Sequence, residues 1–309
     1  MTSKYKVFRN YALTGQKLIN QPFLKKLEKE FIKNKPEDNS PIFIIGPPRT
    51  GSTLLYQVLI SAFKLAYITN FSSFFYKAPA LATWLSNPVY SRYKSNEFES
   101  SFGFIPGLWS PSEGGKLMRY WLENREISPA FIRKTSGGIS QIMGGPFIIK
   151  NLLNSLRIEK INSVFNEPIF LYIKRDPVYT CQSNLVMRKK LFGTYKKWWS
   201  VKPPDFEKLK NLGPFKQVAG QVRGIENFIE KNIESGKVEN IIQINYEDFC
   251  VNTQKTMDDI KALILENNIK LKQRDYDLKS LNLKPSREKK LDGREWKLLK
   301  ETVDHVWNS

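Results

Sequence analysis

The chain has 309 residues, 41% of them hydrophobic and 13% aromatic, which is enough for a substantial core in one large or two modest domains. No apolar run approaches the ~20 residues that a transmembrane helix needs. Lysine and arginine number 49 against 30 acidic residues, and the net charge of +19 favours anionic partners by long-range steering. Because the charge is spread along the chain, compositional drift explains it equally well.

The scarcity of cysteine and histidine excludes several kinds of site. Cys181 and Cys250 cannot form a disulfide framework, and the first fifteen residues lack the apolar segment of a secretion signal, so we expect a cytoplasmic protein. His305 is the single histidine. A single histidine is too few for zinc sites of the histidine–cysteine type. A serine–histidine–aspartate triad would have to use His305, close to the end of the chain.

The first predicted elements are a helix over Phe23–Lys33, a polar loop over Asn34–Ser40 and a buried strand over Pro41–Ile45. The strand is followed by a tight turn and by a helix predicted from Ser52 to about Ala66. The first N–H groups of a helix lack intrahelical partners and carry the positive end of the dipole, so a strand, turn and helix in this order predict an anion site.

The turn itself, GPPRTGST, has the residues that such a site needs. Gly51 lets the backbone approach a phosphate closely, and Arg49 offers charge-assisted hydrogen bonds. Thr50, Ser52 and Thr53 add hydroxyl donors.

The turn differs from a nucleotide P-loop in one position. Gly46, Gly51 and Thr53 match its G-x-x-x-x-G-K-[ST] spacing, but Ser52 occupies the place of the lysine that reaches the β- and γ-phosphates. The loop therefore suits a phosphate group and argues against ordinary ATP or GTP chemistry. The alternative is a strand–helix turn that binds nothing.

Two aromatic or glycine-rich segments follow. Phe71–Leu85 predicts a helical or irregular wall of core or of an acceptor pocket, and Asn87–Pro111 predicts little regular structure. Glu113 comes next, between a proline and two glycines. It is either a site carboxylate on a loop or a residue of the first turn of a helix capped by Ser110 or Ser112.

The second half of the chain alternates strands with helices. Strands are predicted at Pro146–Asn151, which includes Lys150, at Pro168–Lys174 and at Glu239–Asn245. Helices are predicted at Leu153–Phe165, from Pro177 onward, at Pro214–Lys231, at Thr253–Glu266 and close to the C-terminus. An aromatic and basic segment with Trp198 and Trp199 lies between two of these helices.

This alternation predicts an α/β protein with a P-loop-like three-layer fold, in which helices flank a central, mainly parallel sheet. Ligands of such folds bind at the carboxyl ends of the strands. The residues that follow the four strands should therefore converge on one edge. They lie at Gly46–Gly51, Lys150–Asn151, Arg175–Pro177 and Tyr246–Asp248.

These motifs resemble the sulfotransferase superfamily, whose members use 3′-phosphoadenosine 5′-phosphosulfate (PAPS), in particular its bacterial-type members. PPRTGSTLL is similar to the family's 5′-phosphosulfate loop, which also lacks the P-loop lysine. YIKRDPVYTCQSNL resembles its 3′-phosphate motif, with Arg175 and Ser183 at the family's spacing, and Tyr246-Glu247-Asp248 resembles a segment near the adenine. The resemblance runs from Pro41 to Leu265.

The resemblance implies roles for further residues. Lys150 fits a lysine near the transferred sulfuryl group, and Leu152 stands where small-molecule cytosolic members have a histidine base. Glu113 then becomes the candidate base, as in members that use a glutamate. Arg287, Lys289 and Lys290 are candidates for the rest of the 3′-phosphate site.

The predicted function is transfer of a sulfuryl group from PAPS to a hydroxyl or amine of an acceptor, by a single domain over 1–309 with its donor-binding core at about 41–265. Catalytic roles fall to Glu113, Lys150 and Arg49, with no metal; the acceptor is a small molecule or a glycan. The alternatives are a P-loop-type kinase or NTPase and a non-catalytic nucleotide-binding protein. A nucleic-acid partner is disfavoured because no basic and aromatic stripe is concentrated anywhere. Nothing in the sequence indicates the oligomeric state.

Overall fold

The computed structural model describes residues 22–38, 40–90, 98 and 103–308. Its elements in chain order are α2 (Pro22–Phe31), β1 (Ile42–Ile45), α3 (Ser52–Ala62), α4 (Asn70–Phe74), α5 (Pro79–Tyr90), α6 (Gly115–Glu123), α7 (Pro129–Met143), β2 (Ile148–Lys150), the 3₁₀ helix η1 (Leu152–Leu156), α8 (Ile158–Asn162), β3 (Ile169–Lys174), α9 (Pro177–Phe192), α10 (Phe206–Leu209), α11 (Pro214–Glu234), β4 (Ile241–Asn245), α12 (Tyr246–Val251), α13 (Thr253–Glu266), the 3₁₀ helix η2 (Leu278–Ser280) and α14 (Gly293–Asn308).

The four described strands form one parallel sheet in the order β2-β1-β3-β4. Ile42 pairs with Ile148 of β2 on one side and with Ile169 of β3 on the other, and Phe170 pairs with Ile241 of β4. β1 and β3 are almost fully buried, as expected for parallel strands that helices cover on both faces. The predicted α/β class, with its parallel sheet, is confirmed.

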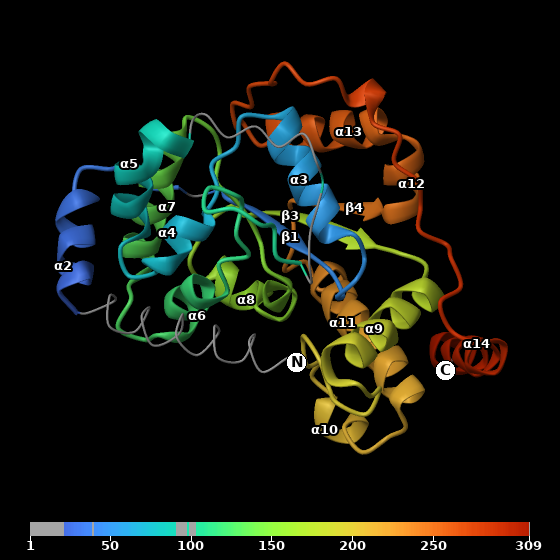
Figure 1. Ribbon diagram of the computed structural model, residues 1–309. Helices are drawn as coiled ribbons and strands as arrows, with labels where there is room; N and C mark the ends of the chain where they lie inside the picture. The colour runs from blue at the N-terminus through green and yellow to red at the C-terminus, as the bar shows by residue number, and fades with distance from the viewer. Residues whose placement is uncertain (1–21, 39, 91–97, 99–102, 309) are drawn as a thin grey trace.

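The helices lie in layers on the two sides of this sheet (Figure 1). α3 and α13 lie on one side, and α8 and α11 lie on the other. A further group of helices, α2, α4, α5 and α7, lies together at one end of the molecule. Most buried hydrophobic residues form one cluster around the sheet, and a smaller cluster joins α9, α11 and α14.

Several predicted boundaries differ from the structure. The helix expected to reach Ala66 ends at Ala62, because Phe63 is extended and Ala66 makes a parallel bridge to Phe147. The single helix expected over Leu153–Phe165 is η1 and α8, separated at Arg157, whose φ of −125° is not helical.

The helices α7 and α5 also depart from the predictions. α7 was not predicted, although Ser128 accepts a hydrogen bond from Phe131 N and Pro129 starts the helix, as is typical of helix N-termini. The segment Asn87–Pro111, expected to be irregular, begins inside α5. Its residues 91–97 and 99–102 lie outside the described residues, as do the N-terminal residues 1–21 and Asn39 of the predicted polar loop. No helix in the described ranges combines the length and the apolar character needed to cross a membrane.

Candidate active site

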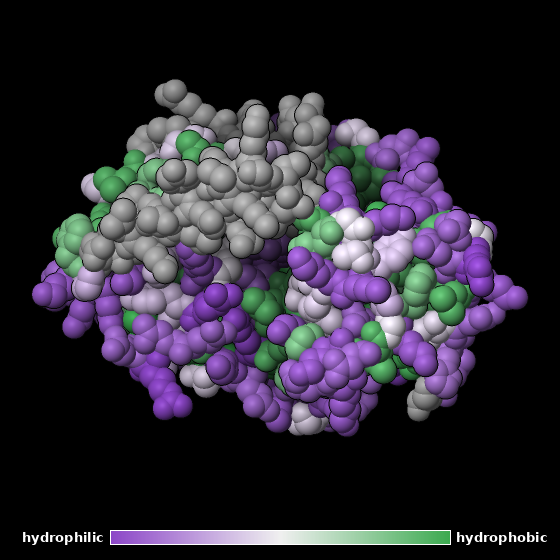
Figure 2. Space-filling view, turned by 60° about the horizontal axis from the view of Figure 1, so that its bottom comes forward, coloured by the Kyte–Doolittle hydropathy of each residue, from purple (hydrophilic) through white to green (hydrophobic). Residues whose placement is uncertain are grey.

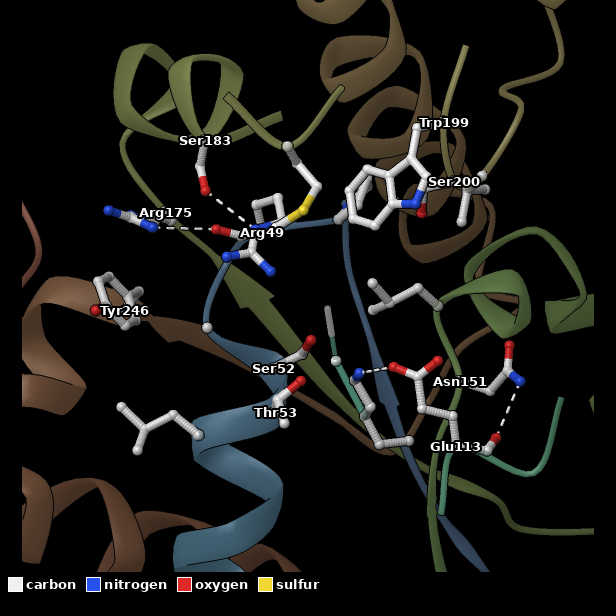
Figure 3. A pocket seen from close by; sticks show the side chains of 18 of the residues that line it. Arg49, Ser52, Thr53, Glu113, Asn151, Arg175, Ser183, Trp199, Ser200 and Tyr246 are labelled. Atoms are coloured by element: carbon white, nitrogen blue, oxygen red, sulfur yellow. Dashed lines mark hydrogen bonds and ion pairs between the residues drawn. The ribbon is translucent and has the colours of Figure 1, made fainter. Parts of the chain in front are cut away.

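The carboxyl ends of all four strands open into one cavity of about 930 Å³. This volume is near the upper end of the ~300–1,000 Å³ range of ligand pockets. Its lining residues follow β1, β2, β3 and β4 and also come from α6, α9 and the segment before α10. The predicted convergence of the strand ends on one edge therefore holds. Figure 3 shows the side chains that face the cavity.

The loop after β1 is fixed at its start and open at its end. Gly46 donates its N–H to Ser155 Oγ at 2.9 Å, and the same hydroxyl donates back to the Gly46 carbonyl at 3.1 Å. Gly51 is the N-cap residue of α3, and no side chain caps the helix. The first N–H groups of α3 thus lack a side-chain cap at the cavity wall, where Ser52 and Thr53 also lie.

Gly51 cannot be replaced by a larger residue without rearrangement. Its φ is +91°, and a Cβ would lie 2.3 Å from Cδ2 of Tyr246. The tyrosine ring therefore packs directly on the backbone at the helix N-terminus, and only glycine permits both the backbone conformation and the contact.

Arg49 lines the cavity and is held in an unusual conformation. Its φ of +75° is in the left-handed region, which costs a non-glycine residue roughly 1–2 kcal/mol. In this conformation its Nε donates to Ser183 Oγ at 3.0 Å, and its carbonyl accepts from Nη1 of Arg175 at 3.2 Å. Burial, followed by the nearby charge of Arg175, lowers the pKa of Arg49. An anion bound beside these two guanidinium groups would offset their repulsion.

Arg175 has one buried guanidinium donor without a protein partner. Its guanidinium lies 4.6 Å from the centre of the Tyr246 ring, and Nη2 donates to the carbonyl of Ser286. Its Nε is buried and has no hydrogen-bond partner among the described residues. A buried donor without a partner costs about 1–3 kcal/mol, so an anion that accepts from it would be stabilising.

Glu113 and Lys150 form an ion pair on the opposite side of the cavity (Figure 3). The Lys150 side chain is 2% exposed, whereas that of Glu113 is 43% exposed and faces the cavity. Asn151 donates to the Glu113 carbonyl at 3.0 Å and so fixes the loop before α6. Glu113 is not part of the helix, because α6 begins at Gly115 with Gly114 as its N-cap. Of the two interpretations of Glu113, the capped helix turn is therefore wrong.

One of the three C-terminal basic candidates reaches the cavity. Gln182 accepts a hydrogen bond from Lys290 N at 2.7 Å and donates to the carbonyl of Glu288 at 2.9 Å, which ties this segment to α9 and places Lys290 in the lining. Lys289 instead lies 5.6 Å from the Trp296 ring, and Arg287 is exposed and outside the lining.

The remaining predicted residues divide between the cavity and the packed interior. Thr50 is fully buried, and its hydroxyl donates to the Pro47 carbonyl at 2.9 Å, so that side chain does not line the cavity. Trp199 lines the cavity, whereas Trp198 packs against Phe206. The aromatic residues of the predicted wall pack among themselves and with Trp109 and Tyr120, outside the lining. The predicted site residues that the structure brings together are Arg49, Gly51, Ser52, Thr53, Glu113, Lys150, Arg175, Ser183 and Tyr246.

Two residues of the site were missed from the sequence. Arg119 and Lys202 line the cavity, and they carried no signal because lysine and arginine occur throughout the chain. Asn151, expected at the converging strand ends, lines the cavity and orients the Glu113 loop.

A buried hydrogen-bond network around Arg188 was also not predicted from the sequence. Arg188 is 0% exposed and donates to Gln217 Oε1 at 2.7 Å and to Gln221 Oε1 at 3.1 Å. Gln221 in turn donates to the carbonyls of Trp199 at 2.9 Å and Val201 at 2.6 Å. The sequence placed Arg188 in a basic run, where a solvated side chain is the ordinary expectation.

Comparison with known proteins identifies the family. The profile of the sulfotransferase family matches residues 41–264, which is well over half of the chain. No curated protein sequence matches significantly. Among solved structures, a sulfotransferase from Mycobacterium tuberculosis superposes with a TM-score of 0.53 at 15% identity, over 91% of this chain and 81% of that one. A sulfotransferase from Mycobacterium avium gives a TM-score of 0.47 at 13% identity, over 75% of this chain and 65% of its own, so this chain spans just under two thirds of its length.

The chain belongs to the sulfotransferase family, and its fold is that of the Mycobacterium tuberculosis structure. Its cavity has three features on this structure alone that suit an anionic ligand. These are the α3 N-terminus without a side-chain cap, the unpartnered Nε of Arg175 and the glycine cradle under Tyr246. Among the described residues, no cluster of three or more histidine, cysteine, aspartate or glutamate side chains could hold a metal ion.

Proposed function

We propose that this protein transfers a sulfuryl group from PAPS to a hydroxyl or amine of an acceptor. The observation that carries the proposal is the contact of Arg49 with both Ser183 and Arg175. Through it, the two sequence motifs that resemble phosphate sites, more than a hundred residues apart, become neighbouring parts of a single cavity.

The donor would be held at both of its anionic groups. The N–H groups at the start of α3, with Ser52 and Thr53, suit the 5′-phosphosulfate. Arg175, Ser183 and, from the C-terminal segment, Lys290 suit the 3′-phosphate, which ADP and ATP lack. Tyr246, on the same side of the cavity, offers a ring against the adenine.

Bound PAPS supplies a sulfuryl group attached to a phosphate leaving group. The acceptor oxygen or nitrogen forms the new bond to sulfur, the bond from sulfur to the phosphate oxygen breaks, and the acceptor proton passes to the carboxylate of Glu113. Lys150 and Arg49, with the loop N–H groups, stabilise the negative charge that develops on the phosphate oxygen. The Lys150 ion pair and the Asn151 hydrogen bond hold Glu113 in position.

Calorimetric titration with 3′-phosphoadenosine 5′-phosphate (PAP) and, in parallel, with ADP tests the donor site. We expect PAP to bind at least about tenfold more tightly, because charge-assisted hydrogen bonds contribute about 1.5–3 kcal/mol each. Arg175→Ala should remove this preference. Arg287→Ala is the matched control and should leave it intact, since Arg287 is exposed and outside the cavity lining. Equal binding of PAP and ADP would overturn the proposal and favour a kinase or NTPase.

The catalytic roles need a second measurement. With a sulfated product detected from ³⁵S-labelled PAPS, Glu113→Gln should lower turnover by about 10²–10⁴-fold, the range for loss of a general base, while PAP affinity changes little. A variant that binds PAP normally and keeps full turnover would assign the base elsewhere. Binding of PAP without turnover of any acceptor would favour a non-catalytic nucleotide-binding protein.

A further inference from the structure

The cavity is lined by more lysine and arginine residues than the proposed binding of PAPS requires. Its lining includes a single carboxylate, that of Glu113, among the described residues. The lysine and arginine residues that line it are Arg49, Arg119, Lys150, Arg175, Lys190, Lys202 and Lys290. A bound donor with a 3′-phosphate of about −1.5 to −2 and a phosphosulfate faces Arg49, Lys150 and Arg175, with Lys290 beside them. Arg119, Lys190 and Lys202 remain, and of these the Lys202 ammonium also lies 4.1 Å from the centre of the Phe206 ring.

Arg119 lies on the side of the cavity that contains Glu113. Gly115 and Arg119 both line the cavity and are four residues apart on α6, so they share a face and are separated by about 6 Å along the axis. The nearest carboxylate to Arg119 is that of Glu123 at 3.8 Å, but Glu123 also pairs with the largely buried Arg157. One carboxylate thus serves two guanidinium groups, and Arg119, 63% exposed, retains net positive charge toward the cavity.

Lys202 belongs to a segment of the cavity wall whose backbone is held in place by hydrogen bonds. The wall segment, residues 199–202, is fixed by Gln221, which donates to the carbonyls of Trp199 and Val201. Ser200 within this segment adopts a φ of +70°. Three described non-glycine residues have a left-handed backbone conformation, and two of them, Arg49 and Ser200, line the cavity. Such strained conformations persist only where the surroundings fix them.

The wall segment also presents an aromatic face. Trp199 lines the cavity. Leu152 and Leu153, which follow Asn151 in the sequence, line it as well. In Figure 3, Trp199 and Ser200 lie on the Glu113 side of Ser52 and Thr53, away from Arg175. The surface seen in Figure 2 is mainly hydrophilic, with smaller hydrophobic areas between the hydrophilic ones.

We infer that the acceptor is an anion: a molecule with a hydroxyl or amine, an apolar or ring face against Trp199, and a carboxylate, phosphate or sulfate that Arg119 and Lys202 bind. This inference rests on the proposed function, because it assigns the part of the cavity that the donor does not fill. On this inference, part of the strongly positive charge of the chain serves to select the acceptor.

Three matched alcohols test the inference: 4-(hydroxymethyl)benzoate, its neutral benzamide and the cationic 4-(hydroxymethyl)benzylammonium. Each is titrated into the protein with and without saturating PAP, followed by ligand-observed NMR. We expect the benzoate to bind about tenfold or more tightly than the benzamide and the ammonium compound to bind least, because one charge-assisted contact is enough for that ratio. The preference should shrink as salt is added.

Variants assign the effect to residues. Arg119→Gln and Lys202→Gln should each reduce the preference for the benzoate, whereas Lys208→Gln should not, because Lys208 is exposed on α10 outside the lining. Equal binding of benzoate and benzamide, binding of none of the three compounds, or a preference that survives both cavity variants would overturn the inference. Normal PAP binding in that case leaves the proposed function standing, whereas loss of PAP binding with an intact benzoate preference would overturn the proposed function alone.

Discussion

Two glutamines on α11 provide a test of how the acceptor wall is held. Gln217 and Gln221 are one turn apart, and each accepts a hydrogen bond from Arg188. Gln221 donates to the wall segment at Trp199 and Val201, but Gln217 donates to the carbonyls of Lys210 and Leu212, away from the cavity. The same substitution at the two positions therefore separates loss of stability from loss of the wall.

Gln221→Leu should destabilise the fold and loosen the wall. It leaves one N–H group of Arg188 and the Val201 carbonyl buried without partners, at about 1–3 kcal/mol each, so we expect a loss of about 2–6 kcal/mol in the free energy of unfolding. The two lost bonds to the wall, each with a net contribution of about 0.5–1.5 kcal/mol, should speed amide hydrogen exchange in residues 199–202 by roughly 5- to 150-fold.

The assay combines urea denaturation, hydrogen exchange followed by mass spectrometry, and titration with PAP and with 4-(hydroxymethyl)benzoate. Gln221→Leu should weaken benzoate binding and spare PAP binding, because the donor residues are held by α3 and α9. Gln217→Leu should lower stability similarly without faster exchange in residues 199–202 and without weaker benzoate binding. The reasoning is refuted if the two variants change exchange in the wall equally, or if Gln221→Leu weakens PAP binding as much as benzoate binding.

Two further outcomes follow from the structure. Gly51→Ala places a Cβ 2.3 Å from the Tyr246 ring at a φ of +91°, so PAP affinity measured by calorimetry should fall about tenfold or more. The control Gly213→Ala, whose Cβ meets no atom within 4 Å, should leave the affinity unchanged. Equal affinities of the two variants would contradict this prediction. Burial raises the pKa of Glu28 to about 7 from 4.5, although the side chain accepts hydrogen bonds from Ala80 and Leu81. Because the folded state then keeps a proton that the unfolded state releases, the contribution of Glu28 to stability should be greatest at low pH and fall by about 3 kcal/mol as pH rises from 4.5 to 7. Urea midpoints of Glu28→Gln across this range should show a correspondingly smaller decline, and an unchanged decline would place the titration elsewhere.

Local signals in the sequence were sufficient to predict the sheet and the gathering of the strand-end residues around one cavity. Short β-branched strands are visible in the chain itself, and parallel strands that alternate with helices end on a common edge. For that reason the motifs alone predicted that Arg49, Arg175 and Ser183 lie together. Glu113 remained ambiguous, since a carboxylate after proline and serine suits a helix start as well as a site loop.

Long-range packing selects which of the many basic residues matter. Lys290 reaches the cavity because Gln182 ties its segment to α9, whereas Arg287, three residues earlier, does not. Arg188 is buried between side chains of α11 and the Trp198 ring, although it stands in the longest basic run of the chain. These outcomes depend on contacts between residues tens of positions apart, and the local composition of a lysine-rich chain is the same in a solvated face, a buried network and a binding site.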